Sequence, residues 1–394
     1  MQSNSSPRAL KALSWSILLL VCGYSICYNI LGITLNPLID EFALTGASQG
    51  LMSSVMNLGS MIPLVILQLL QGRVSKLRLI LLSCALQFAM LLLTGAAANF
   101  STLLVACALL GAGNNFTDSC ANSYIVDLHP EDSARYLGLL HGFYGVGGLI
   151  TPLLISYVLG RSGWRAAYFV AAAVFALPCL LLAAAGLRTR GASGAVSASG
   201  EARFSRAMLK QYLRNPRSLL LMGAAALYAA SQLGLVTWVA RYTAVRFDDA
   251  QTGSLCLSAY WICATLCRIF CPRLPFAPSK MLVFGAAGAG VFHALGVLSG
   301  SAPGMIVASA LVGLVSGLCI PVLLGEAARG NEDRTSLTTA SLFLMMGLAR
   351  MLMPLLMGAT ADFSIVVAML LPAGAALLCA LLCALARRRA PERS

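Results

Sequence analysis

Hydrophobic residues in this chain of 394 residues gather into about twelve long runs, which short polar breaks separate. Each run is long enough for one bilayer crossing, since a membrane-spanning helix needs roughly 20 apolar residues. The runs lie near residues 14–36, 46–70, 79–97, 101–126, 136–159, 166–187, 218–243, 251–272, 280–299, 303–325, 336–360 and 364–386.

The pattern within the runs favours helices over strands. Backbone polar groups find no water in hydrocarbon, so a chain crosses a membrane either as helices or as a closed barrel. Barrel strands would be segments of about ten residues with alternating hydrophobicity, which these long runs are not. We therefore expect an all-α integral membrane protein with twelve transmembrane helices in a lipid bilayer. The composition agrees, because 59% of residues are hydrophobic and 10% are charged, whereas soluble domains have about 25% charged residues.

Basic residues are distributed unevenly over the polar breaks. If both termini lie on one side of the membrane, 22 of the 27 Lys and Arg fall on that side and four on the other. Breaks rich in Lys and Arg face the cytoplasm, so we expect both termini to be cytoplasmic. The chain is then a multi-pass protein of the cell membrane, and we expect the bacterial cytoplasmic membrane. The net charge of +13 becomes an orientation signal, and no nucleic-acid partner is expected.

The longest polar break, residues 188–217, is rich in Gly, Ala and Ser and then in basic residues. It predicts a cytoplasmic linker between an N-terminal six-helix bundle, 1–187, and a C-terminal one, 218–394. An offset of 202 residues places 109–111 on 311–313, and both triplets are two aliphatic residues followed by Gly. The offset predicts two pseudo-symmetric bundles with a binding site near the bilayer midplane.

Thirteen cysteines all lie inside or at the edge of apolar runs, without histidine at metal-ligand spacing. They are typical of small packing residues. The sequence has no phosphate-cradling loop and no nucleophile and base pair within the runs. We therefore expect no metal, no cofactor and no enzymatic activity. The run after Lys11 is too long for a signal-peptide core, which favours a retained first helix.

Asp118 is the one carboxylate that lies clearly inside an apolar run. A charged carboxylate at mid-bilayer costs ~2.5 to 3.5 kcal/mol, so such groups persist mostly where they line a cavity, bind an ion or carry a proton. Asn114 or Asn115, Asp118 and Asn122 recur at spacings of three and four, which places them on one helix face. This stripe is the first candidate site, with Asp118 in a coupling role.

Other polar residues within the runs have a packing alternative. In the first run Asn29 forms a stripe with Ser25, which lines a cavity or hydrogen-bonds neighbouring helices. His141 and Tyr144 share a face of the fifth run, where His141 either shuttles protons or is a neutral interhelical partner.

The second half contributes three further candidates and one interfacial residue. Gln232 and Trp261 offer hydrogen-bonding and stacking groups, and Trp261 suits either the core or a ligand platform. Trp238 is expected in the aromatic belt at the membrane surface. Arg350 stands where the repeat has Gly148, and it either snorkels toward the interface or binds an anionic substrate group.

Three stretches resemble the fucose permease-like sugar transporter branch of the major facilitator superfamily. They are Asp118 to Asn122, Leu137 to Gly147, and the pair Cys267-Arg268. The resemblance implies that Asp118 is the coupling acid and that four residues line a sugar cavity. Those four are Asn29, His141, Tyr144 and Gln232. Two departures stand out, because Gly32 replaces a first-helix acid of the branch and Gln232 replaces a seventh-helix Glu.

We therefore expect a secondary active transporter, a monomer, that moves a sugar or sugar derivative by alternating access. Coupling to a proton or sodium gradient would run through Asp118 and His141, and the solute would contact Asn29, Asn114, Asn115, Asn122, Tyr144, Gln232, Trp261 and Arg350. One alternative is an exporter or organic-anion carrier that uses Arg350 as its anion site. Another is a non-transporting membrane receptor or assembly protein with this fold.

Overall fold

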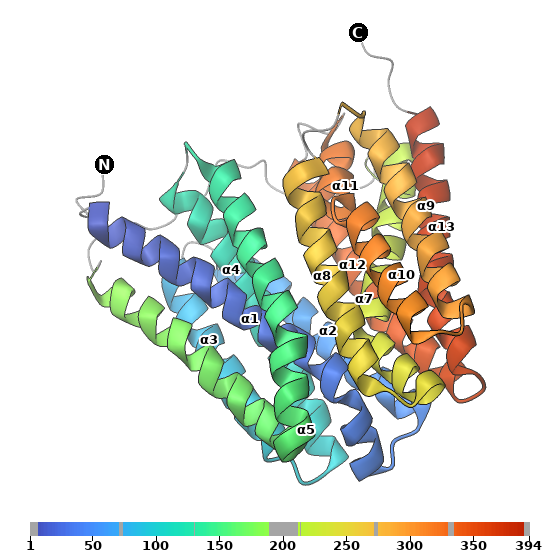
Figure 1. Cartoon of the computed structure of the whole chain (residues 1–394). Helices are drawn as coiled ribbons and strands as arrows, with labels where there is room; N and C mark the ends of the chain where they lie inside the picture. Colours follow the sequence, from blue (N-terminus) through green and yellow to red (C-terminus); the bar gives the residue numbers. More distant parts are fainter. Residues whose placement is uncertain are drawn as a thin grey trace. The chain divides into compact units, whose positions relative to one another are not determined.

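The computed structural model describes residues 7–70, 74–129, 131–188, 212, 214–271, 275–329 and 335–389. These described residues form helices joined by short turns, with no strand among them (Figure 1). The predicted all-α class is confirmed. The helices are α1 (Pro7–Phe42), α2 (Gly46–Leu70), α3 (Lys76–Gly95), α4 (Phe100–Leu128), α5 (Ser133–Arg188), α7 (Pro216–Phe247), α8 (Ala250–Phe270), α9 (Pro278–Leu298), α10 (Ala302–Ser316), α11 (Cys319–Ala328), α12 (Thr335–Ala361) and α13 (Ile365–Arg388).

The helices account for twelve membrane crossings. Nine helical stretches within the described residues are long and apolar enough to cross a membrane. One of them, the 56-residue α5, contains two crossings, because Gly163 turns the chain with φ of 78°. The combination of φ 78° and ψ 175° is strained for residues that have a Cβ but open to glycine, so this residue makes the turn. Helices α10 and α11 share one crossing. Helices α2 and α8 coincide with the predicted runs 46–70 and 251–272, and counting them gives the twelve expected crossings.

Polar side chains fix where several helices begin. The side chain of Asn99 accepts from Thr102 N, and that of Asp249 accepts from Gln251 N and Thr252 N. Such caps satisfy amides that have no partner within the helix. Hydrogen bonds from Thr252, first of all from its hydroxyl, lower the pKa of the Asp249 carboxyl. The polar breaks of the sequence are therefore also helix start signals.

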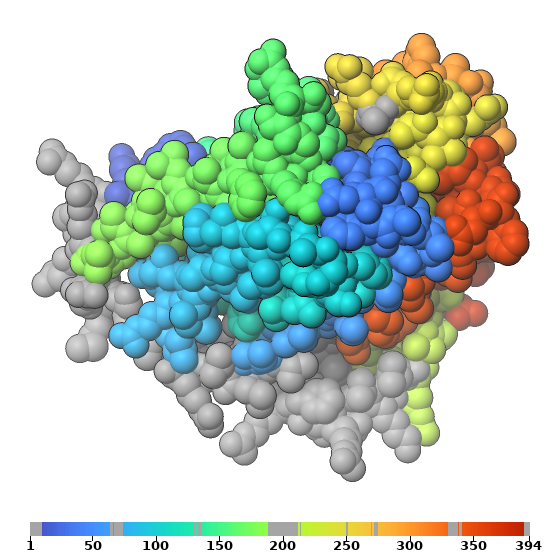
Figure 2. All heavy atoms as spheres, turned by 90° about the horizontal axis from the view of Figure 1, so that it is seen from below, coloured from blue at the N-terminus to red at the C-terminus, as the bar shows by residue number. Residues whose placement is uncertain are grey.

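The chain forms two compact units. Unit 1 comprises Met1–Ala43 and Val55–Ser199, and unit 2 comprises Leu44–Ser54 and Gly200–Ser394. In unit 1, α3 lies beside both α4 and α5, and Figure 2 shows their side chains as one closely filled surface. Most of the predicted linker, 189–211, lies outside the described residues, so the linker stays a prediction.

The start of α2 belongs with unit 2 because it packs on α12. The amide of Gly46 donates to Asp362 Oδ1 at 2.7 Å, and Ser54 Oγ donates to the Met351 carbonyl at 2.6 Å. Between these bonds, a Cβ on Gly50 would collide with the carbonyl of Pro354. Two hydrogen bonds that involve side chains, together with the missing side chain of Gly50, hold α2 and α12 close together.

Unit 1 and unit 2 use glycine at matching positions. A Cβ on Gly111 would meet the Met56 carbonyl, and a Cβ on Gly313 would meet the Tyr260 carbonyl. The two glycines are 202 residues apart, which is the offset that the sequence pattern predicts. In both units, a glycine without a side chain therefore allows the fourth helix of the six-helix bundle to pack directly against the second helix.

Candidate functional site

The predicted polar stripe lies on α4. Asn122 Nδ2 donates to Asp118 Oδ1 at 2.9 Å and to the Asp118 carbonyl at 2.8 Å. Asp118 is half-buried, and the two residues are one helical turn apart. Asn115 Oδ1 accepts instead from Ser119 Oγ at 3.1 Å, again within the helix. The stripe thus contains a carboxylate held by a neighbouring amide.

Asn114 differs from these neighbours. It is 3% exposed, and among the described residues neither its Oδ1 nor its Nδ2 has a hydrogen-bond partner. Buried polar groups are nearly always paired with protein, water or ligand, and an unpaired one costs about 1–3 kcal/mol. Asn114 therefore has a donor and an acceptor that no described residue uses, one turn from Asp118.

A second polar group lies between α1 and α5. Asn29 Nδ2 donates to the Ser25 carbonyl at 2.8 Å, while its buried Oδ1 has no partner among the described residues. The Tyr144 ring lies against Tyr24 and Tyr28, with ring centroids 5.4 and 6.4 Å away.

Gly147 explains how Tyr144 reaches α1. A Cβ on Gly147 would collide with the Cys22 carbonyl, so the glycine allows α5 to approach the α1 backbone. Tyr144 is one turn earlier on the same helix and is brought against the α1 tyrosines. His141, a further three residues back, is exposed. It therefore lies outside the buried polar groups, and its coupling role stays a prediction.

Gln232 and Trp261 come together in unit 2. Gln232 Nε2 donates to Tyr260 Oη at 2.9 Å, and the Trp261 ring makes an edge contact with the Tyr260 ring at 5.1 Å. Trp261 is buried, as a core residue or a ligand platform would be. Tyr260 was missed by sequence reasoning, although it directly precedes Trp261 in the chain.

Trp238 is not an interfacial belt residue. Its side chain is wholly enclosed in unit 2, at 0% exposed. The prediction was wrong because nearness to a helix end does not reveal which way a side chain faces, and here the indole fills the interior of the bundle.

Arg350 lies on α12 and is half-buried. Among the described residues no carboxylate lies within ion-pair distance of its guanidinium. The cation is therefore not neutralised by a neighbouring acid in the described part of the chain.

A polar seam between α3 and α4 was not predicted. Gln87 Nε2 donates to Thr117 Oγ1 at 2.6 Å, and Thr117 Oγ1 lies 2.8 Å from Ser83 Oγ. Because Ser83 Oγ donates to the Ile80 carbonyl, the hydroxyl proton of Thr117 must go to Ser83. The signal in the sequence was the spacing of four between Ser83 and Gln87, which places both on one helix face.

The candidate residues divide between the units. Unit 1 contains Asn29, Asn114, Asn115, Asp118, Asn122, His141 and Tyr144, and unit 2 contains Gln232, Trp261 and Arg350. No group of three or more His, Cys, Asp or Glu that could hold a metal occurs within the described ranges.

Three kinds of similarity connect the chain to known proteins. Residues 17–324 match the sequence profile of the Major Facilitator Superfamily. A segment of 107 residues is 32% identical to the human vesicular acetylcholine transporter and 31% identical to that of Rattus norvegicus. That segment is 27% of this chain and 20% of each relative, so the match spans about a fifth of these curated relatives.

Solved structures share the whole fold. A bacterial homologue of the human lysosomal transporter Spinster, in an inward-facing and unoccupied conformation, matches with a TM-score of 0.77. Its occupied form matches with 0.72, and in both cases the identity is 16% over 98% of each chain. This likeness is one of fold, and the fucose permease-like branch stays a prediction. Since the profile covers most of the sequence, the chain belongs to the Major Facilitator Superfamily, whose members are membrane transporters.

Proposed function

We propose that this chain is a secondary active transporter that moves a small polar solute, a sugar or sugar derivative, by alternating access. Transport would be coupled to a proton or sodium gradient through Asp118. The observation that carries the proposal is the arrangement on α4. There the Asp118 carboxylate accepts from Asn122, one turn from the buried and unpartnered amide of Asn114.

The polar groups of unit 1 suit a hydroxylated solute. A side-chain amide offers a donor and an acceptor, which match adjacent hydroxyl groups. Asn114 offers both, and Asn29 Oδ1 offers one further acceptor. The ring of Tyr144 adds an apolar face against which a sugar ring can stack. A solute bound here would satisfy buried groups that the described protein leaves unpaired.

Asp118 supplies the chemistry of coupling. Its carboxylate is the charged group on this stripe, and binding of a proton or sodium ion neutralises it. A group that changes charge biases the two access states differently, which a permanently neutral amide cannot do. The Asn122 amide would hold the Asp118 carboxylate in place while the carboxylate binds and releases the proton or sodium ion.

The test is Asp118→Asn in proteoliposomes. We expect the variant to keep solute binding and solute exchange, but to lose accumulation driven by an imposed proton or sodium gradient. Asp132→Asn, at an exposed acid in the turn before α5, is the matched control and should accumulate solute normally. Gradient-driven accumulation by Asp118→Asn at the wild-type rate would remove Asp118 from the mechanism.

A second candidate is carriage of an organic cation. Three tyrosine rings, Tyr24, Tyr28 and Tyr144, gather in the unit that contains Asp118. Aromatic faces and a carboxylate bind quaternary ammonium groups, and acetylcholine in the name of the matched relatives is such a cation. Thermal-shift measurements with sugars and with choline-like cations distinguish the two. Asp118→Asn should abolish binding of a cation and spare binding of a neutral sugar.

The organic-anion alternative depends on Arg350. It predicts that sugar acids stabilise the purified protein more than neutral sugars, and that Arg350→Gln removes the difference. Equal stabilisation by both solutes would exclude an anion site at this residue.

A further inference from the structure

Helices α9 and α13 of unit 2 lie side by side (Figure 1). A Cβ on Gly290 of α9 would meet the Ala373 carbonyl and the Leu377 side chain of α13. As the ninth and twelfth crossings, the two helices run in opposite directions. Lys280 is ten residues before Gly290, and Arg387 is ten residues after Leu377. The start of α9 therefore lies beside the end of α13, at the same surface of the membrane.

Basic residues occupy this shared helix end. Lys280 lies in the first turn of α9, Arg387 and Arg388 lie in the last turn of α13, and Arg389 follows directly. All four are exposed, and we call them the basic rim. Neither helix contains an acidic residue, and within the described ranges none of the four forms an ion pair. The basic rim therefore presents four positive charges to its surroundings.

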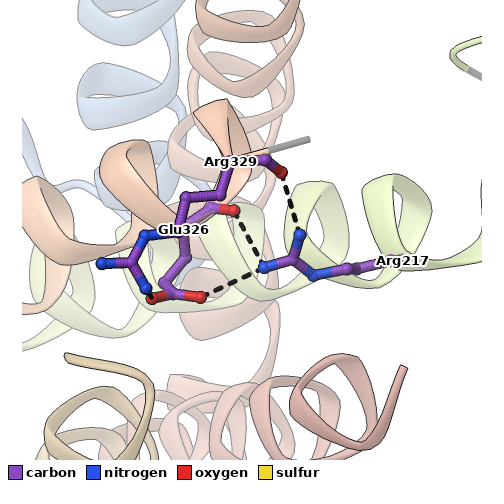
Figure 3. A network of polar contacts seen from close by, with 3 residues as sticks. All are labelled: Arg217, Glu326 and Arg329. Atoms are coloured by element: carbon purple, nitrogen blue, oxygen red, sulfur yellow. Dashed lines mark hydrogen bonds and ion pairs between the residues drawn. The ribbon is translucent and has the colours of Figure 1, made fainter. Parts of the chain in front are cut away.

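Two other arginines of unit 2 are neutralised by the protein itself. Figure 3 shows Glu326 paired with Arg217 at 3.1 Å and with Arg329 at 2.7 Å. Arg217 also donates to the carbonyls of Glu326 and Arg329, at 3.2 and 2.9 Å. In the described structure the basic rim has no such carboxylate, so its charges are available to an anion from outside the protein.

Toward the bilayer centre from the basic rim, both helices present apolar side chains to lipid. Phe284 is 72% exposed and lies one turn beyond Lys280, on the same face of α9. On α13, Leu381 and Leu385 are exposed, and Arg388 continues their spacing of three to four residues. Each apolar stripe thus ends in a cation. A molecule that covers both features needs a hydrocarbon body and an anionic head.

We propose that the surface between α9 and α13, made of the basic rim, Phe284, Leu381 and Leu385, binds an anionic phospholipid. Guanidinium groups donate paired hydrogen bonds to phosphate oxygens, and Lys adds a point charge. The acyl chains of the same molecule lie on the phenylalanine and the two leucines. Each Lys or Arg near the headgroups strengthens binding to an anionic surface roughly fivefold. The inference depends on neither the solute nor the coupling ion.

Photocrosslinking at Phe284 tests which lipid lies there. The phenylalanine is replaced by a benzophenone amino acid, and the protein is placed in vesicles of phosphatidylcholine with a minor share of phosphatidylglycerol of the same acyl chains. We expect phosphatidylglycerol to be enriched at least roughly fivefold among the crosslinked lipids. Phe169, an exposed phenylalanine of unit 1, is the matched position and should capture both lipids in their bulk ratio. The bulk ratio at position 284 would overturn the site.

Two matched triple variants separate the basic rim from the net charge of the protein. One removes three charges from the basic rim, through Lys280→Gln, Arg387→Gln and Arg388→Gln. It should return the crosslinks at position 284 to the bulk ratio. The other removes three charges at exposed positions of unit 1, through Lys11→Gln, Arg78→Gln and Arg135→Gln. It should leave the enrichment unchanged, and an equal loss in both variants would assign the effect to net charge.

The chain with its basic rim intact keeps the site testable if the rim variant does not fold. Its enrichment should fall as salt is raised, because salt screens exposed charges. An enrichment that salt leaves unchanged would mean that charge is not its cause. An excess of glycerol phosphate, which has the anionic group without acyl chains, should not displace the lipid. Displacement would assign the basic rim to soluble phosphate esters instead.

Discussion

Single glycines set the closest helix contacts of this protein. A Cβ on Gly111 would lie inside the contact radius of the Met56 carbonyl, so α4 cannot keep its place on α2 if a methyl group is added. We expect Gly111→Ala to destabilise the fold by about 1–3 kcal/mol, the usual cost of forcing extra volume into a filled interior. The melting temperature of the purified protein measures this loss.

The control uses a glycine with space around it. A Cβ on Gly138 of α5 meets nothing within 4 Å. Gly138→Ala should leave the melting temperature unchanged or raise it slightly, because alanine favours helices more than glycine does. Equal losses in both variants would mean that backbone contact is not what Gly111 provides.

The Glu41 and Arg165 pair predicts a pH dependence. Hydrogen bonds from Arg165 and Trp164 hold the pKa of the Glu41 carboxyl below its ordinary value of 4.5. A lowered pKa contributes stability above the unfolded value, and this stability is lost as pH falls through the folded value. Glu41→Gln should therefore cost stability at neutral pH, and this cost should disappear as the pH falls from 4.5 through the lowered pKa of the folded Glu41 carboxyl.

The effect should be small, because the two side chains are 42% and 38% exposed. Exposed pairs contribute at most about 1 kcal/mol. Unfolding followed between neutral and acidic pH, for the wild type and Glu41→Gln, measures the difference. A gap between them that widens in acid would contradict the prediction.

Residues that share a helix were the predictable part of the site. Asp118 and Asn122 are four apart, so helical periodicity alone brings them together, as the 2.9 Å bond confirms. Arg217 and Glu326 are 109 residues apart, and no local period connects them. The prediction that Trp238 lies in the aromatic belt failed for a related reason, because the rotation of a helix about its axis depends on all the helices around it.

Helix positions followed closely from hydrophobic run lengths, because the bilayer fixes how many residues each crossing needs. The interruption at Gly317 did not follow, and the tenth run was predicted as one helix. Proline alone does not mark such a break, since Pro63 and Pro354 lie inside continuous helices. What differs near Pro321 is that Arg268 and Tyr228 donate hydrogen bonds to the backbone carbonyls of Gly317 and Ser316.

The polar seam between α3 and α4 predicts how much hydrogen bonds between these two helices stabilise the fold. Thr117→Val keeps the shape of the side chain and removes the acceptor of Gln87 and the donor to Ser83. Interhelical hydrogen bonds in membranes contribute about 0.6 kcal/mol on average and up to about 1.7. We expect a loss in that range, measured as a shift in the unfolding midpoint.

Thr237→Val is the matched control for this seam. Among the residues that the structure describes, its hydroxyl donates to the Leu233 carbonyl of its own helix. This variant should be close to neutral. A loss as large as that of Thr117→Val would assign the effect to helix propensity rather than to the seam.

For the whole molecule, the charge bias predicts the orientation. Cysteines placed singly at Ser162 and Ser301, both exposed, should react with an impermeant thiol reagent added from outside the cell. One at Ser197, which lies outside the described residues, should react only after the membrane is opened. The reverse labelling pattern would invert the topology.

The fold class was predictable from the sequence because a bilayer permits few solutions for a chain with twelve apolar runs. The repeat of the two bundles was predictable at positions where both bundles need a glycine for a close helix contact, as at Gly111 and Gly313. The solute was not predictable, because the amide and aromatic residues proposed to bind it are of types that also serve in helix packing.

The interrupted crossing also has a consequence for how the protein is made. The 15 residues of α10 and the ten of α11 are each shorter than the roughly 20 that insertion requires, so they must enter the membrane as one segment. Two carbonyls would then face lipid without partners. Synthesis proceeds from the N-terminus, so Tyr228 and Arg268 already stand in the membrane when Gly317 leaves the ribosome. The order of the helices along the chain thus supplies the partners before they are needed, and a permuted chain in which α10 precedes α7 should insert poorly.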